Sequence, residues 1–306
     1  GRLPPGLLLQ LAWRNLWRNS HRTLITAASV FFAVVLVLFT RSMQLGSYGH
    51  IIQNTLKLYT GYVQVHADGY WNERSIDKSM HAADSLVRIA HSAPHVTMAV
   101  PRLESFALAS FGAHTRGTMV IGIDPALEDS LNDAADRIIA GRYFSPEEKR
   151  ILIANRLAEY FDIGVGDSLV LLGQGYYGVS AAAVYPVGGI IDVPSPDLSS
   201  QLVYLPLREA QWFYSVPGRI TSLALMTDDP GAVPALIERL RGKLTDRYEV
   251  MGWRELVPEL VQSIELDNAG GIIMLGILYL VIAFGMFGTI VMMAAERKRE
   301  FAVLLA

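Results

Sequence analysis

The glycine-rich run from Gly173 to Gly178 is the nearest match in the sequence to a motif that carries chemistry. It has the spacing GxGxxG, follows a predicted strand and precedes Asp192, which stands roughly where a ribose-binding acid would be sought. A dinucleotide site also needs a helix that opens at the glycines, inside a unit of ~30 residues. Only a short alanine-rich stretch separates these glycines from Tyr185. We therefore interpret the run as a glycine-rich hairpin loop.

Two histidines, His91 and His95, are four residues apart and could place two metal ligands on one helix face. Pro94 lies between them and disfavours the helical conformation at Ala93. The sequence has no cysteine, no GxSxG motif and no Walker-type glycine-lysine loop. We expect no metal site, no cofactor and no catalytic site in this chain, which argues against an enzyme.

Two apolar windows point instead to a membrane. Leu24 to Thr40 is 17 residues long and Ala269 to Ala295 is 27, both without a formal charge. A helix needs about 20 largely apolar residues to cross a bilayer. The first window reaches that length when Met43 and Leu45 are included and Arg41 extends to the headgroups. The predicted spans are 22–46 and 269–295.

The charges beside the spans predict the orientation. Basic residues precede the first span and follow the second, and basic residues stay on the cytoplasmic side. Both ends are therefore predicted to be cytoplasmic, with residues 47–268 outside the cytoplasm. Apart from the flanking charges, Arg41, Glu296 and Glu300, 18 basic residues stand against 27 acidic ones. This balance argues against nucleic acid as a partner.

Helical periodicity extends beyond both spans. Residues 1–21 are predicted to hold an amphipathic helix on the cytoplasmic surface, with tryptophans on one face and arginines on the other. Residues 48–59 and 253–264 continue each span outward as an amphipathic stalk.

The segment between the stalks mixes helical and strand periods, which predicts an α+β domain. A first subdomain is expected from about 60–125 plus 215–252, with a strand-rich subdomain inserted at about 126–214. The predicted strands are 62–67, 96–100, 105–110, 119–123, 151–154, 168–172, 185–191, 201–205, 220–226 and 249–251, and the predicted helices are 82–92, 156–161 and 233–244.

Three segments resemble the permeases of the MacB/FtsX/LolC-LolE class of ABC transporters. Residues 11–22 are similar to the A-x-R-N-L-x-R-x-x-x-R entry into that class's first span. Residues 151–169 resemble its V-I-I-G-x-x-L-A-x-x-L-G-L-x-V-G-D segment, and residues 296–306 resemble its E-R-x-R-E-I-G-I-L-x-A helix. The order and spacing of the three segments carry the resemblance over nearly the whole chain.

The resemblance implies a four-span protein of a bacterial cytoplasmic (inner) membrane with a MacB-type domain that is periplasmic or extracellular, and this chain holds two of the spans. It also implies that residues 296–306 begin a coupling helix seated on a separate ATPase dimer, which would hold the ATP and magnesium. The residues expected there are Glu296, Arg297, Lys298, Arg299, Glu300 and Phe301. Other implied partners are a second permease, the same or homologous, membrane lipid, and a periplasmic carrier or adaptor.

Apolar side chains at the outer ends of the spans suggest a groove for an amphiphilic substrate such as a lipoprotein. The residues assigned to it are Met43, Leu45, Tyr48, Ile52, Ile273 and Met274. By resemblance, an outer loop would meet a carrier through Gln174, Tyr176, Tyr177 and Tyr185, although the Pro-Met tip expected there is absent. Two alternatives stay open: MacB-like export of a peptide or antibiotic with an adaptor, and FtsX-like signalling to a cell-wall hydrolase.

Overall fold

The computed structural model describes residues 6, 13, 14, 17, 20–82 and 84–296. The chain divides into two compact units, each treated by itself below. The first contains the described residues up to Ile51 and from Glu259 onward, and the second runs from Ile52 to Pro258.

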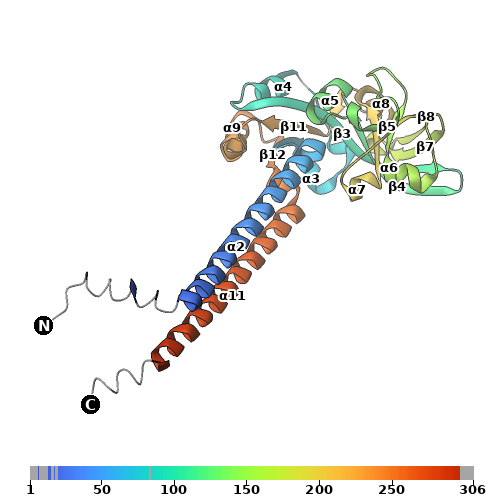
Figure 1. The fold of residues 1–306 in the computed structure, drawn as a ribbon. Helices are drawn as coiled ribbons and strands as arrows, with labels where there is room; N and C mark the ends of the chain where they lie inside the picture. Colours follow the sequence, from blue (N-terminus) through green and yellow to red (C-terminus); the bar gives the residue numbers. More distant parts are fainter. Residues whose placement is uncertain (1–5, 7–12, 15–16, 18–19, 83, 297–306) are drawn as a thin grey trace, which may run out of the picture. The chain divides into compact units, whose positions relative to one another are not determined.

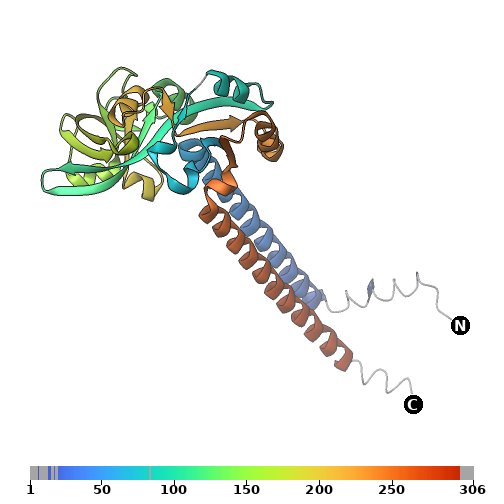
Figure 2. The same ribbon diagram turned by 180° about the vertical axis from the view of Figure 1, so that it is seen from behind.

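The first unit is a pair of long helices lying side by side, α2 (Ser20–Thr55) and α11 (Pro258–Glu296) (Figures 1 and 2). Segments of 27 and 35 residues within them are long and apolar enough to cross a membrane, and neither is buried by the rest of the protein. At 1.5 Å per residue the two helices are about 54 and 58 Å long, well beyond the ~30 Å of a bilayer's hydrocarbon core. Both predicted spans therefore lie within longer unbroken helices.

The amphipathic helix predicted within residues 1–21 falls mostly outside the described residues. Trp13, Arg14 and Trp17 have helical backbone, and the two indole rings lie 6.1 Å apart between centroids. Both tryptophans are exposed. This i, i+4 pairing agrees with a tryptophan face on that segment.

The second unit contains a ten-stranded mixed sheet, and the hydrogen-bonded order of nine strands is β12-β1-β11-β3-β4-β9-β6-β8-β5, while β7 pairs with both β3 and β8. Among the described strand pairs, β4–β9 and β6–β8 are parallel and the others are antiparallel. A separate two-stranded sheet joins β2 to β10. The strands are β1 (Val63–Ala67), β2 (Met80–His81), β3 (Val96–Phe111), β4 (His114–Ile123), β5 (Ile138–Gly141), β6 (Ile151–Ala154), β7 (Ser168–Gln174), β8 (Ser180–Ile191), β9 (Leu202–Pro206), β10 (Arg219–Ile220), β11 (Ser222–Thr227) and β12 (Tyr248–Gly252).

Short helices cover this sheet and close its ends. They are α3 (Tyr70–Glu73), α4 (Asp84–His91), α5 (Pro125–Asn132), α6 (Asn155–Phe161), α7 (Pro196–Ser199), α8 (Leu207–Phe213), α9 (Val233–Lys243) and α10 (Trp253–Leu256). Single turns of 3-10 helix are η2 (Ile76–Lys78), η3 (Ala135–Arg137), η4 (Tyr176–Gly178) and η5 (Pro230–Ala232), and η1 (Leu56–Thr60) is a π-helical turn.

The two largest apolar cores among the described residues lie along the sheet. One packs α4 and α9 against β1, β3, β11 and β12. The other packs α6 and α8 against β3, β4 and β6 to β9. Because β3 contributes to both cores and β4 pairs with β9, the sheet is continuous between the parts that the sequence suggested as two subdomains. The predicted α+β class is confirmed.

The long strand β3 differs from the prediction, which had separate strands at 96–100 and 105–110. The structure joins them into one strand of 16 residues. The interruption expected at Pro101–Glu104 is absent because the side chains of Arg102 and Glu104 are buried with polar partners.

Candidate functional site

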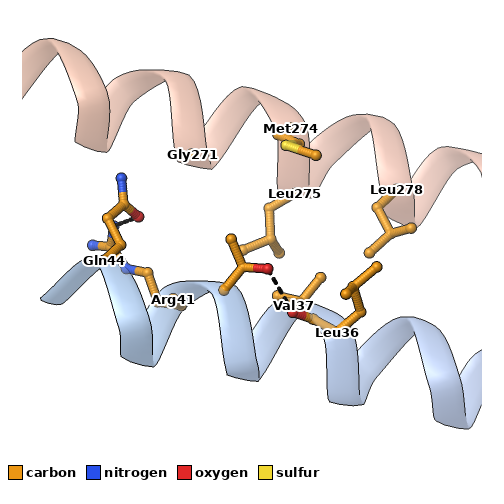
Figure 3. Close-up of a pocket in the computed structure, with 9 residues that line it drawn as sticks. Leu36, Val37, Arg41, Gln44, Gly271, Met274, Leu275 and Leu278 are labelled. Atoms are coloured by element: carbon orange, nitrogen blue, oxygen red, sulfur yellow. Dashed lines mark hydrogen bonds between the residues drawn. The ribbon is translucent and has the colours of Figure 1, made fainter. Parts of the chain in front are cut away.

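A pocket lies between the two membrane helices, within the first unit (Figure 3). It has a volume of about 180 Å³. Its walls come from one face of each helix, at spacings of three to five residues that bring side chains onto one stripe. The lining residues are Leu36, Val37, Thr40, Arg41, Gln44, Gly271, Met274, Leu275 and Leu278.

The pocket is apolar along most of its length and polar at one end. Leu275 and Leu278 point from α11 toward α2 (Figure 3). The hydroxyl of Thr40 donates to its own helix, at the carbonyl of Leu36, 2.8 Å away, so it adds little polarity to the wall. Arg41 and Gln44 lie at the other end, opposite Gly271. The arrangement suits a molecule with an apolar tail and a polar head.

A chain of hydrogen bonds fixes the polar end. Arg41 Nη1 donates to Gln44 Oε1 at 2.9 Å, and Gln44 Nε2 donates to Asp267 Oδ2, also at 2.9 Å. The hydroxyl of Tyr48 donates to the same oxygen of Asp267. Asp267 therefore holds the Gln44 amide with its oxygen toward Arg41. Polar contacts of this kind between membrane helices contribute about 0.6–2 kcal/mol each.

The structure distributes the predicted groove residues over different places. Met274 lines the pocket and Tyr48 belongs to the hydrogen-bonded chain. Met43, Leu45 and Ile273 are more than half exposed on the helix pair and do not line it. Their helical positions are offset from the Arg41–Gln44 and Gly271–Leu275 stripes, because neighbouring residues differ by about 100° around a helix of 3.6 residues per turn.

Ile52 belongs to the second unit. Apart from Met274, sequence reasoning missed the residues that line the pocket, and it also missed Asp267. A usable signal was the spacing on α11: Gly271 and Asp267 stand three and seven residues before Met274, and Leu275 stands four residues after Gly271.

The predicted outer loop is the β7–β8 hairpin, in which Gln174 pairs with Ser180 and the 3-10 turn η4 forms the tip. The glycine-rich run is thus a hairpin loop, as predicted. Tyr177 is 77% exposed, and its backbone N–H donates to Asp77 Oδ1 at 2.6 Å. Tyr176 is half-buried beneath the guanidinium of Arg219, 5.0 Å from its ring centroid.

Tyr185, the fourth residue assigned to that loop, is buried in the core. Its hydroxyl donates to Glu209 Oε1 at 3.0 Å. Burial is the main cause that raises the pKa of Tyr185, and the negative charge of Glu209 is the second. Within this set, Gln174 and Tyr177 present exposed side chains.

The segment that joins α2 to β1 is held by a buried ion pair. Arg102 and Glu128 are almost fully buried, 2.6 Å apart between Nη2 and Oε1, and Arg102 also donates to the carbonyl of Tyr59 in η1. Burial disfavours the charge on Arg102, but Glu128 raises its pKa above the ordinary value. Asp124 supports this arrangement, because its carboxylate caps α5 through the N–H groups of residues 126 and 127.

A glycine ends the π-helical turn. Gly61 has φ of 67° and donates to the carbonyl of Leu56 at 2.7 Å. A Cβ atom at this position would lie 3.0 Å from the carbonyl oxygen of Leu225. The connection from α2 to β1 is therefore a defined turn rather than a loose loop.

The two histidines lie on different parts of the backbone, and most of the predicted coupling segment lies outside the described residues. His91 ends α4, whereas His95 has φ of 67° beyond the helix and lies 2.9 Å from Asp228, so the two do not share a helix face. Glu296 is the last residue of α11, and residues 297–306 lie outside the described residues.

No protein-family model matches the sequence. The chain is 24% identical over 302 residues to the lipoprotein-releasing system transmembrane protein LolC of Xylella fastidiosa, covering 94% of this chain and 69% of that protein. It is also 24% identical over 296 residues to LolC of Neisseria meningitidis, covering 93% and 68%.

Two solved structures are also similar. One is the extracellular domain of the noncanonic ABC-type transporter YknZ from Gram-positive bacteria, with a TM-score of 0.43 and 11% identity, covering 62% of this chain and 99% of that domain. The other is the periplasmic region of MacB from Actinobacillus actinomycetemcomitans, with a TM-score of 0.45 and 13% identity, covering 70% and 98%.

The LolC matches extend through both membrane helices and the domain between them. Over nearly its whole length, this chain is similar to the LolC transmembrane proteins of lipoprotein-releasing systems.

Proposed function

We propose that this permease extracts or exports an amphiphile, such as a lipoprotein, from the outer leaflet of the cytoplasmic membrane, driven by a separate ATPase dimer. In this proposal both ends of the chain are cytoplasmic and residues 47–268 are periplasmic or extracellular. Residues 296–301 contact the ATPase, which holds the ATP and magnesium. A second permease, the same or homologous, completes the complex.

The observation that carries the proposal is the continuity of the two helices. Each is at least 36 residues long without a break, which is long enough to cross a bilayer and continue beyond it. The chain then enters β1 through η1 and leaves β12 through α10, and these two strands are neighbours in the sheet. A displacement at the cytoplasmic end of either helix would therefore reach adjacent strands.

The pocket between the helices supports an amphiphilic cargo. It combines an apolar wall with a polar end, and apolar cavities of about this size take up apolar guests rather than water. The function stated in the name of the LolC relatives, lipoprotein release, fits such a cargo. Lipid extraction would use the face that includes Met274 and Leu275.

Two other functions use the same architecture. Export with an adaptor would engage a partner through the exposed tip of the β7–β8 hairpin at Tyr177. Signalling to a cell-wall hydrolase would move no cargo, so the apolar pocket would have no transport role. Lipoprotein release is favoured because it explains the pocket and agrees with the named relatives.

Mass spectrometry of the complex purified from native membranes tests the proposal. We expect an ATP-binding subunit together with a lipid-anchored protein or a soluble carrier. An adaptor in place of the carrier would favour export, and a cell-wall hydrolase without any amphiphile would favour signalling. Absence of an ATP-binding subunit under conditions that keep the two permeases together would contradict the proposal.

A further inference from the structure

The guanidinium of Arg41 is the one charged group among the nine described residues that line the pocket. Its Nη1 atom donates a hydrogen bond to Gln44 Oε1 at 2.9 Å, and the guanidinium forms no ion pair with a described residue. A guanidinium carries five N–H donors in a planar fork. Most of the donors of Arg41 are therefore available to a ligand.

The neighbouring acid does not use these donors. Asp267 accepts hydrogen bonds from Gln44 and Tyr48, and both donors approach the same carboxylate oxygen. These contacts reach Arg41 only through Gln44, which accepts from the Nη1 atom of the guanidinium. The result is a cation positioned at the end of an apolar pocket, which matches an anionic group attached to an apolar tail.

Space for the anionic group comes from Gly271 on the facing helix. A Cβ atom there would lie 3.7 Å from Gln44 Oε1 and 3.8 Å from Arg41 Nη1, so any longer side chain would occupy the volume beside the guanidinium. Figure 3 shows this glycine opposite Arg41 and Gln44. The next glycine, Gly270, faces open space.

We propose that this pocket binds a membrane phospholipid, with its phosphate on Arg41 and one acyl chain along Leu275 and Leu278. Arginine recognises phosphate through two parallel hydrogen bonds, and basic pockets between membrane helices bind lipid headgroups. Arg41 directly follows the uncharged stretch 24–40, which places the guanidinium at headgroup depth. The inference goes beyond the proposed function, because it concerns a membrane lipid that holds the pocket while no cargo occupies it.

Native mass spectrometry of the full chain, purified in mild detergent with phosphatidylglycerol added, tests this site. The competitor is a diacylglycerol with the same acyl chains and no phosphate. We expect phosphatidylglycerol to stay bound and the diacylglycerol to be lost. Arg41→Gln and Gly271→Leu should each lower phosphatidylglycerol occupancy about tenfold or more, since a hydrogen-bonded charge contributes about 1.5–3 kcal/mol.

Two matched variants control for charge and bulk. Lys57→Gln removes a positive charge at an exposed position outside the pocket, and Gly270→Leu adds the same side chain where the glycine has no neighbours. Both should bind phosphatidylglycerol as the unchanged chain does. Equal retention of diacylglycerol by the unchanged chain, or full retention of phosphatidylglycerol by Arg41→Gln, would overturn the proposal. The comparison of phosphatidylglycerol with diacylglycerol uses the unchanged chain, so it tests the phosphate site even if a variant fails to fold. It also needs no ATPase, so its result is independent of cargo release.

Discussion

At the scale of single residues, His66 is a buried histidine in the second unit. Its ring stacks on Tyr70 at 5.1 Å between centroids and lies 5.4 Å from the ring of Trp71. Its Nδ1 is 3.1 Å from the carbonyl oxygen of Thr221. Burial lowers the pKa of His66 to about 4, from an ordinary value of 6.5. The folded protein therefore keeps this imidazole neutral at a pH where the unfolded chain binds a proton.

This difference predicts an acid-sensitive contribution to stability. Because the unfolded chain takes up the proton first, the free energy of unfolding falls as the pH drops from about 6.5 toward 4. For one such group the loss between pH 7 and pH 5 is about 2 kcal/mol. His66→Phe keeps the aromatic stacking and removes the titration, so we expect the variant to lose about 2 kcal/mol less than the unchanged chain over that interval.

Denaturant unfolding of the full chain in detergent, followed by tryptophan fluorescence at pH 7 and pH 5, measures this effect. The comparison between the two proteins is needed because burial raises the pKa of Glu104, and that group stabilises the fold as the pH falls. A stability difference between the two proteins that stays the same at both pH values would contradict the assignment.

The buried charges also explain where residue-level prediction failed. Arg102 and Glu104 interrupt an apolar run in the sequence, and charged residues are rarely fully buried unless they are paired. Their partners, Glu128 and Ser222, lie 26 and 118 residues away along the chain. Local patterning could not reveal those pairs, so one long strand was predicted as two short ones.

At the scale of helices and strands, the local signals were more informative. Hydropathy located both membrane helices, and apolar periodicity located β6 and α6 within one residue of their observed bounds. Hydropathy alone did not identify the pocket face, because every face of an apolar helix is apolar. The face was set by Gly271 and by the polar residues Gln44 and Asp267, which needed the facing helix to be interpreted.

Helix continuity gives the prediction at this scale. Ser263 is an exposed residue of α11, beyond the predicted span on the side of the outer domain. Proline at this position removes a backbone hydrogen bond and kinks the helix, at a cost of about 3 kcal/mol. If α11 transmits displacement, Ser263→Pro should abolish ATP-dependent cargo release while the complex continues to hydrolyse ATP.

The measurement is the ratio of cargo released to ATP hydrolysed in the reconstituted complex. Ser263→Ala is the matched control, since it removes the same hydroxyl and keeps the helix, and it should leave that ratio unchanged. Normal coupling in a Ser263→Pro complex that assembles fully would show that a rigid α11 is unnecessary.

At the scale of the whole molecule, the order of parts was predictable because it depends on the sequence alone. Two apolar segments with basic outer flanks enclose a long acidic α+β region, and the LolC relatives align through all of it. The continuity of the ten-stranded sheet was not predictable. The parallel pairing of β4 with β9 joins residues about 80 positions apart, and no local signal specifies such pairs.

The proposed permease moves an amphiphile at the expense of ATP. Placing the purified complex in liposomes with a fluorescent diacylated protein, and measuring release into solution, tests this activity. We predict release with ATP and magnesium and none with a non-hydrolysable ATP analogue. Equal release with both nucleotides, or no release from a complex that hydrolyses ATP and has its carrier present, would contradict the claim.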